Sequence, residues 1–170
     1  MQHLNVAAQL DFKELSLCEH LEQAIGVRMS NLELLPQLKG DSLHYRRKAR
    51  LGVRMVKKKG GALVGFREKY GHFITDMESC HVLIKEVADL ILPLRTLIAA
   101  LKGRQIIPQI EVAVGEYKNK DNLREKPQVL NKVAVVIRHL KPLCEADLLT
   151  LCNFAQEYTC LLYTSDAADE

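Results

Sequence analysis

The sequence predicts an α+β fold, in which an antiparallel β-sheet with a basic hairpin packs against two or three helices. Of its 170 residues, 48% are hydrophobic and 26% are charged, which suits one soluble domain with a buried core. Apolar and basic side chains alternate over residues 48–55, and leucines recur at helical spacing on both sides of this segment. Hairpins separated by helices, without regular β–α alternation, are typical of the α+β class.

The chain is expected to begin with a helix. Apolar side chains recur at three-to-four spacing over residues 5–25, Asn5 is a suitable N-cap, and Gly26 can end the helix. A connecting segment with Pro36 and Gly40 follows. Residues 1–44 are therefore predicted to form an N-terminal helix and linker, and residues 45–159 a central α+β domain.

The hairpin is the clearest local signal. Residues 57–61 predict a tight turn because Gly60 and Gly61 adopt positive φ easily. A return strand begins at Ala62, and residues 73–78 predict a third, shorter strand. One face of the first strand carries Ala49, Leu51, Val53 and Met55, and the other carries Lys48, Arg50, Gly52 and Arg54.

Further elements complete the domain. Residues 82–102 predict a helix that Pro93 kinks or divides into two short helices. Alternation predicts strands over residues 110–114 and 133–137, with a charged loop over residues 116–132 between them. A last helix over residues 144–158 is expected to direct one face to the core, formed by Leu148, Leu151, Cys152 and Ala155.

The last eleven residues, 160–170, resemble the translation of a transposon-end sequencing adapter. Such a segment would be foreign to the protein and is not expected to belong to its fold. The alternative is a genuine acidic tail. Cys160 is accordingly not expected to be a functional thiol.

The positive charge is concentrated. Residues 45–69 contain ten basic side chains and one acid, Glu68, so this stretch carries +9 and the rest of the chain −6, within a formal net charge of +3. Such a separation of charge affects which partners bind and how fast they associate, and it does not determine the fold.

A basic strand face suits a polyanion. Alternate side chains project about 7 Å apart, which is close to the spacing of successive phosphates, and Tyr45 could stack on a base. Gly52 and Gly65 would leave room for a partner backbone to approach. The alternative, a solvated hairpin whose charges prevent edge aggregation, stays open. The residues predicted to contact a nucleic acid are Arg46, Arg47, Lys48, Arg50, Arg54 and Arg67, with Arg47 on the opposite face and therefore the weakest.

Known catalytic patterns are missing from the sequence. It contains no GxGxxG, GxxxxGKS/T, HExxH or GxSxG segment, and its six histidines lack metal-ligand spacing. Five cysteines, an odd number without a CxxC pair, argue against a disulfide framework and read singly as buried small hydrophobes. Without a signal region or an uninterrupted apolar span, a cytoplasmic protein is expected, and this chain alone is not expected to be a complete enzyme.

Three segments resemble one enzyme family. They are YRRKARLGVR (Tyr45–Arg54), LVGFREK (Leu63–Lys69) and ITDMESCHVL (Ile74–Leu83). They are similar to the middle of bacterial 23S rRNA uracil-5-methyltransferases, which belong to the S-adenosylmethionine-dependent RNA uracil-C5 methyltransferases. The likeness extends over Gln2–Leu4, Ile107–Gly115 and Val136–Leu143.

The resemblance implies a fragment of an enzyme that forms 5-methyluridine in 23S rRNA. In that family the catalytic cysteine, the general base and the S-adenosylmethionine site lie in a C-terminal domain that this chain lacks, so the fragment is expected to be inactive. By position Cys80 corresponds to the fourth ligand of a 4Fe-4S cluster, whose other three cysteines would precede Met1. Neither cofactor is expected to bind this fragment stably.

The expected partner is 23S rRNA, with no membrane and no second copy of the chain. A non-enzymatic basic module that binds RNA or the ribosome remains the main alternative. A basic hairpin lying on anionic membrane is disfavoured because no exposed aromatic or leucine anchors accompany its lysines.

Overall fold

A computed structural model describes residues 4–26, 28, 33–56, 61–118 and 129–166. The chain divides into two compact units, Met1–Ser42 and Leu43–Glu170. In the first unit, helix α1 (Val6–Ile25) begins where the Asn5 side chain accepts a hydrogen bond from the Ala8 N–H at 2.9 Å. It ends at Gly26, whose φ of 66° is left-handed. The predicted helix and both of its ends are confirmed.

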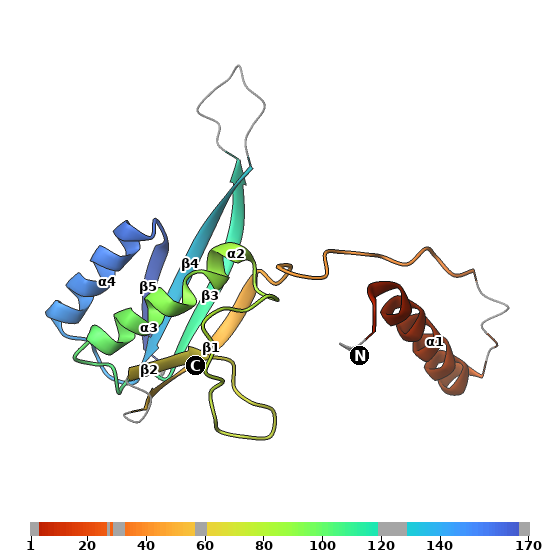
Figure 1. The fold of residues 1–170 in the computed structure, drawn as a ribbon, viewed down its shortest axis with the longest axis horizontal. Coiled ribbons are helices and arrows are strands. Elements are labelled where there is room, and N and C mark those ends of the chain that lie inside the picture. The colour runs from red at the N-terminus through yellow and green to blue at the C-terminus, as the bar shows by residue number, and fades with distance from the viewer. Residues whose placement is uncertain (1–3, 27, 29–32, 57–60, 119–128, 167–170) are drawn as a thin grey trace, which may run out of the picture. The chain divides into compact units, whose positions relative to one another are not determined.

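The second unit is built on a five-stranded sheet (Figure 1). Its strands are β1 (Lys48–Val56), β2 (Gly61–Gly65), β3 (Gln109–Lys118), β4 (Val129–His139) and β5 (Leu161–Asp166). Their order is β2-β1-β3-β4-β5, with antiparallel pairing throughout except for the parallel pair β4–β5. The α+β class and the hairpin of β1 and β2 are confirmed.

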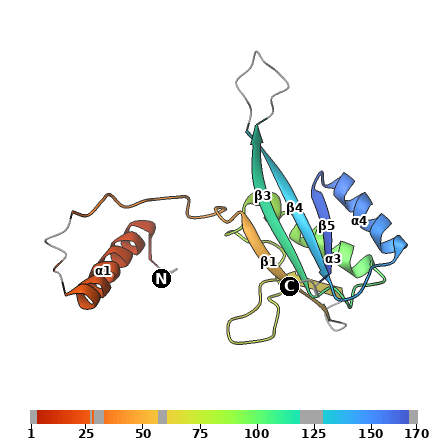
Figure 2. The same cartoon turned by 180° about the vertical axis from the view of Figure 1, so that it is seen from behind.

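Helices lie on one face of this sheet (Figures 1 and 2). They are α2 (Lys85–Ala88), α3 (Ile91–Ala100) and α4 (Glu145–Glu157). The predicted division near Pro93 is confirmed: Pro93 is the third residue of α3, where the missing N–H costs no intrahelical bond. Leu94 and Ile98 of α3 pack with Ile110 of β3 in one core, each fully buried.

Strand β1 shows why one face of the sheet is apolar. Ala49, Leu51 and Val53 are 2%, 0% and 7% exposed, whereas Lys48 and Arg50, which alternate with them, are exposed. Because successive side chains of a strand point to opposite faces, the basic set lies on the side away from the helices. We call this side of the sheet the outer face.

One predicted strand is wrong, and the strands predicted over residues 110–114 and 133–137 are confirmed but are longer than expected. Residues 73–78 form no strand; only Ile74 makes an isolated bridge, to Arg67. The predicted loop over residues 116–132 is shorter than expected, because β3 continues to Lys118 and pairs there with Val129 of β4. Pairing through backbone groups does not require apolar side chains, so a charged segment extends the ladder. The central residues of that loop, and residues 57–60 of the hairpin turn, lie outside the described residues.

The buried face of α4 also differs from the prediction. Leu151 is buried and Ala155 is partly buried, as expected, but Leu148 is 42% exposed and Cys152 is exposed. Asp147 and Phe154 are buried instead, so the buried face is rotated by part of one residue's turn of about 100° while it keeps Leu151 and Ala155. Hydrophobicity alone predicts the wrong buried face here, because Asp147 is a charged residue that is buried where it accepts hydrogen bonds.

The C-terminal segment continues the sheet. Cys160 is 7% exposed, and Leu161–Asp166 pair in parallel with Ala134–His139 of β4. A backbone ladder at an open edge accepts many sequences, so this pairing is compatible with a foreign origin of residues 160–170, which stays a prediction. Across the described ranges, no helix combines the length and hydropathy that crossing a membrane requires.

Candidate nucleic-acid interface

A row of cations follows β1 along the outer face. Lys48, Arg50 and Arg54 are exposed and occupy alternate positions of the same strand. No described carboxylate pairs with Lys48 or Arg54. The Arg54 guanidinium donates to the carbonyl of His72, at 3.4 Å. Most of this charge is therefore available to an anion, and we call Lys48, Arg50 and Arg54 the cation row.

Arg47 lies on the other side of β1. Its Nη1 pairs with Glu116 Oε1 at 2.9 Å, and its Nη2 donates to Asn131 Oδ1 at 2.8 Å. Its Nε also donates to the Val114 carbonyl at 3.4 Å. Each of the three side-chain nitrogen atoms thus has a partner within the fold, so Arg47 is poorly placed to bind a phosphate together with the cation row.

Arg46 and Arg67 flank the cation row. Both are exposed. Arg46 Nε donates to the Lys48 carbonyl at 3.1 Å, and its guanidinium lies 5.2 Å from the ring centre of Phe66. The stem of Arg67 lies near Gly52, on the outer face. Tyr45, which precedes the strand, is 57% exposed.

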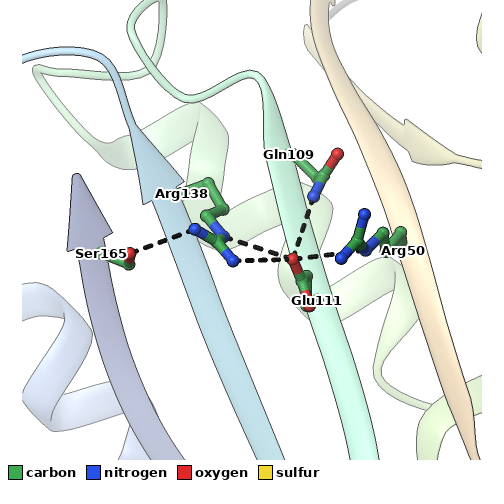
Figure 3. A network of polar contacts seen from close by, with 5 residues as sticks. All are labelled: Arg50, Gln109, Glu111, Arg138 and Ser165. Carbon is green, nitrogen blue, oxygen red and sulfur yellow. Dashed lines mark hydrogen bonds and ion pairs between the residues drawn. The ribbon is translucent and has the colours of Figure 1, made fainter. Parts of the chain in front are cut away.

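Glu111 is the main feature of the outer face that the sequence did not reveal (Figure 3). Its Oε1 atom contacts Arg50 Nε at 3.5 Å, both Nε and Nη2 of Arg138 at 3.2 Å, and Gln109 Nε2 at 3.2 Å. Arg138 also donates to Ser165 Oγ at 3.3 Å. The three ionised groups together retain one positive charge, so the carboxylate positions the guanidinium groups without cancelling their charge.

Only the register of three strands brings this network together. Arg50 of β1 lies opposite Glu111 of β3, and Gln109 of β3 lies opposite Arg138 of β4. In the sequence each of these residues is one polar side chain in an alternating strand, and nothing there specifies which strands are neighbours.

Small side chains leave the outer face hollow beside Lys48. Lys48 lies opposite Ala113, and Ala113 lies opposite Ala134. Next along the ladder, Gly115 lies opposite Lys132. A shallow cavity of about 440 Å³ opens here, lined by Gly115, Glu116, Lys132, Ala134 and Leu161. Lys132, which lay in the predicted loop, is thus a further cation beside the row.

The predicted space over Gly52 and Gly65 is filled by the chain itself. A Cβ atom on Gly65 would collide with the Thr75 carbonyl oxygen, and one on Gly52 would lie 3.0 Å from Ile74 Cδ1. The expectation that these glycines admit a partner backbone is therefore wrong. Instead, the segment after residue 66 folds back and packs against these glycines. The Thr75 N–H of this segment donates a hydrogen bond to the Phe66 carbonyl at 2.9 Å.

Cys80 is partly buried and packs against the core. Within the part of the chain that the structure describes, no three side chains of the metal-binding types gather into a site. The described residues therefore do not by themselves form the ligand set that an iron–sulfur cluster requires. Cys144 and Cys152 are exposed, so the expectation that the remaining cysteines are buried is wrong for these two.

One carboxylate near the interface has a shifted pKa. Glu86 on α2 accepts a hydrogen bond from Asn131 Nδ2 at 2.6 Å, and Asn131 also accepts from Arg47. The Asn131 bond, a backbone hydrogen bond and the Arg47 charge lower the pKa of Glu86 below its ordinary value. This link ties α2 to β4 on the covered side of the sheet.

Comparison with known proteins places the chain in a family. No family model matches it. It is 41% identical over 155 residues to the 23S rRNA (uracil(1939)-C(5))-methyltransferase RlmD of Polaromonas naphthalenivorans, which covers 91% of this chain and 28% of that protein. The enzyme of the same name from Bordetella avium is 41% identical over 158 residues, 93% of this chain and 30% of that protein.

The corresponding enzyme of Xylella fastidiosa is 39% identical over all 170 residues of this chain, which represent 35% of its own length. The chain thus spans about a third of the curated relatives that it matches. Identity at this level over nearly the whole chain confirms the resemblance, and the chain belongs to the 23S rRNA uracil-C5-methyltransferase family.

Proposed function

We propose that this chain is the central part of an S-adenosylmethionine-dependent enzyme that forms 5-methyluridine in 23S rRNA, and that its outer face positions the RNA. The cation row on β1 carries the proposal. Arginine and lysine at alternate strand positions can contact successive phosphates at once, and each contact releases counterions. The names of the relatives, which specify a uracil of 23S rRNA, add the substrate class.

The residues proposed to contact RNA are the cation row and its neighbours. Lys48, Arg50 and Arg54 would hold phosphates directly. Arg46 would extend the track before Lys48, and Arg67 would add a charge beside Gly52. Arg47 is expected to contribute least because Glu116 already pairs with it at 2.9 Å. Glu111 would act by orienting Arg50.

The chemical step is proposed to take place outside this chain. S-adenosylmethionine would supply the methyl group in the part of the enzyme that carries the nucleophilic cysteine and the base. The role of the residues described here is to bind and orient the RNA, so the chain alone is expected to transfer no methyl group.

Cys80 is proposed as one of four cysteine ligands of a 4Fe-4S cluster in the longer enzyme. One thiolate cannot hold such a cluster by itself, so this chain is expected to bind none stably. Anaerobic reconstitution followed by absorbance at about 400 nm tests this expectation, and a persistent band in that region would contradict it.

Filter binding to a 23S rRNA fragment at several salt concentrations tests the interface. The double variant Lys48→Gln/Arg54→Gln is expected to weaken binding and to reduce the slope of log K against log salt by about one unit for each phosphate that the variant no longer binds. Lys85→Gln removes a lysine charge on α2, on the covered side, where Lys85 pairs with Asp89 at 2.7 Å, and is the control. A slope near zero for the unaltered chain, or equal effects of row and control variants, would contradict the proposal.

A non-enzymatic module that binds RNA or the ribosome is the alternative, because the cation row would serve it equally well. The genomic sequence on both sides of this segment separates the two. A cysteine-rich run upstream and a cofactor-binding loop downstream would support the enzyme, and a start and a stop codon at the two ends would support the module.

A further inference from the structure

The turn at residues 68–73 presents two aromatic side chains to solvent. Tyr70 is 96% exposed and Phe73 is 68% exposed. The Glu68 N–H donates to the Phe73 carbonyl at 3.0 Å, and the Gly71 N–H donates to the Glu68 carbonyl at 3.3 Å. These bonds close the turn, so the two rings are held on an ordered backbone. We call residues 68–73 the aromatic turn; it belongs to the yellow-green loop below the sheet in Figure 1.

The backbone of Tyr70 is strained. Its φ is 63°, a left-handed value that a bulky residue rarely adopts. The residue that adopts it is Tyr70 and not the neighbouring Gly71. A conformation of this kind is energetically unfavourable and is concentrated at functional sites. The ring at this position is almost fully exposed, so it contributes little buried apolar area to the fold.

Two contacts anchor the aromatic turn to the strand that carries the cation row. Just outside the turn, Arg67 bridges to Ile74, and Ile74 packs against Gly52 of β1. Within the turn, the His72 carbonyl accepts a hydrogen bond from Arg54 Nη1 at 3.4 Å. The exposed rings therefore belong to the same surface as the phosphate-binding residues that the proposed function requires.

Stacking is the chemistry that such an arrangement favours. Lys69 Nζ lies 4.9 Å from the ring centre of Tyr70, so a cation accompanies one ring. Sequence-tolerant single-strand binders combine a cationic backbone track with aromatic rings on which unpaired bases stack. The bases of a duplex are already stacked and cannot use such rings.

We propose that Tyr70 and Phe73 stack on unpaired bases of an RNA whose phosphates lie along the cation row, so that this surface selects single-stranded over double-stranded RNA. The inference rests on the proposed function, because it requires that RNA bind to the outer face. It adds the conformation of the substrate and two residues that contact its bases.

The full 170-residue chain, an oligouridylate and an RNA duplex of equal charge provide the test. Tyr70→Ala is expected to weaken oligouridylate binding about tenfold and to leave duplex binding unchanged. The salt dependence should stay the same, because every phosphate-binding cation remains in place. Tyr70→Phe keeps the ring and should bind as the unaltered chain does, and Phe73→Ala should behave like Tyr70→Ala.

Tyrosine fluorescence gives a second readout, since the chain contains five tyrosines and no tryptophan. Oligouridylate should quench part of the emission, and Tyr70→Phe should lose that part while keeping its affinity. Because Tyr70 is almost fully exposed, its variants should fold normally, which circular dichroism checks.

Failure of the inference and failure of the proposed function are distinguishable. If the unaltered chain binds both RNAs with a strong salt dependence and Tyr70→Ala binds as tightly as the unaltered chain, the stacking inference is overturned and the proposed function stands. If the unaltered chain binds neither RNA, the proposed function fails and the inference fails with it.

Discussion

Arg138 on β4 contacts one carboxylate oxygen of Glu111 on β3 through two of its nitrogen atoms, Nε and Nη2, each at 3.2 Å. The two side chains are 18% and 13% exposed, so this is the most enclosed ion pair described on the outer face. Arg50 reaches the same oxygen at 3.5 Å from a side chain that is 64% exposed. Arg138 is thus held to the sheet, whereas Arg50 remains accessible to a phosphate.

Glu111→Gln is expected to lower the free energy of unfolding by about 1–2 kcal/mol, because Arg138 loses its charged partner in a partly enclosed position. The same change removes the contact that orients Arg50 and should therefore weaken RNA binding. Urea denaturation followed by circular dichroism measures the first effect, and filter binding the second. An unchanged unfolding midpoint would show that the pair contributes nothing in solution.

Arg47 and Lys48 are adjacent, but substituting them is expected to have opposite effects on stability and on RNA binding. Arg47→Gln breaks the ion pair with Glu116 and should reduce stability by no more than about 1 kcal/mol, with a small effect on RNA binding. Lys48→Gln should weaken RNA binding and leave the thermal midpoint unchanged. Melting curves and RNA titrations of both variants check this, and the reverse pattern would reject the assignment of the two faces.

Gly65→Ala should destabilise the sheet by about 2 kcal/mol or more, because the new methyl group meets the Thr75 backbone and not a movable side chain. Gly115→Ala is the matched control, since nothing lies within 4 Å of its added Cβ atom. That variant should be neutral or slightly stabilising. Equal unfolding midpoints for the two variants would contradict the close packing of residues 74 and 75 on the hairpin.

Stability should fall in acid through Asp147. Burial alone would raise the pKa of this carboxyl group, but hydrogen bonds from the Lys102 and Gly103 N–H groups, both at 2.8 Å, lower the pKa below the ordinary 3.8. A lowered pKa in the folded state stabilises the protein above the unfolded-state value and ceases to do so as the pH falls through the folded-state value.

Asp147→Asn should therefore be less stable than the unaltered chain at neutral pH, and the difference should shrink in strong acid. Urea denaturation at a series of pH values measures it. A stability difference that does not depend on pH would exclude the ionised carboxylate as its cause.

Residues 160–170 are expected to be replaced by another sequence in the natural gene. Long-read sequencing across codon 160 tests this, and the same eleven residues in such reads would contradict it. Since β5 pairs with β4 through backbone groups, a natural continuation that is extended would occupy the same edge.

Local patterns predicted much of the fold correctly. Helix α1 with Asn5 and Gly26 at its ends, the hairpin of β1 and β2 and the division near Pro93 all depend on neighbouring residues, so they can be read from short segments. The same locality explains the wrong strand at residues 73–78. That segment is predicted as a strand from its own residues, but it crosses the glycines of the hairpin and makes only one bridge, from Ile74.

The sequence by itself determined the family, the strand elements of the basic hairpin and the separation of Arg47 from its neighbours on β1, because side chains alternate along a strand whatever surrounds it. Only the tertiary structure decided which strands are neighbours, and thus that Glu111 meets Arg50 and Arg138 and that the aromatic turn lies beside Arg54. Strand order and register depend on contacts between residues far apart in the chain, and no local pattern encodes them.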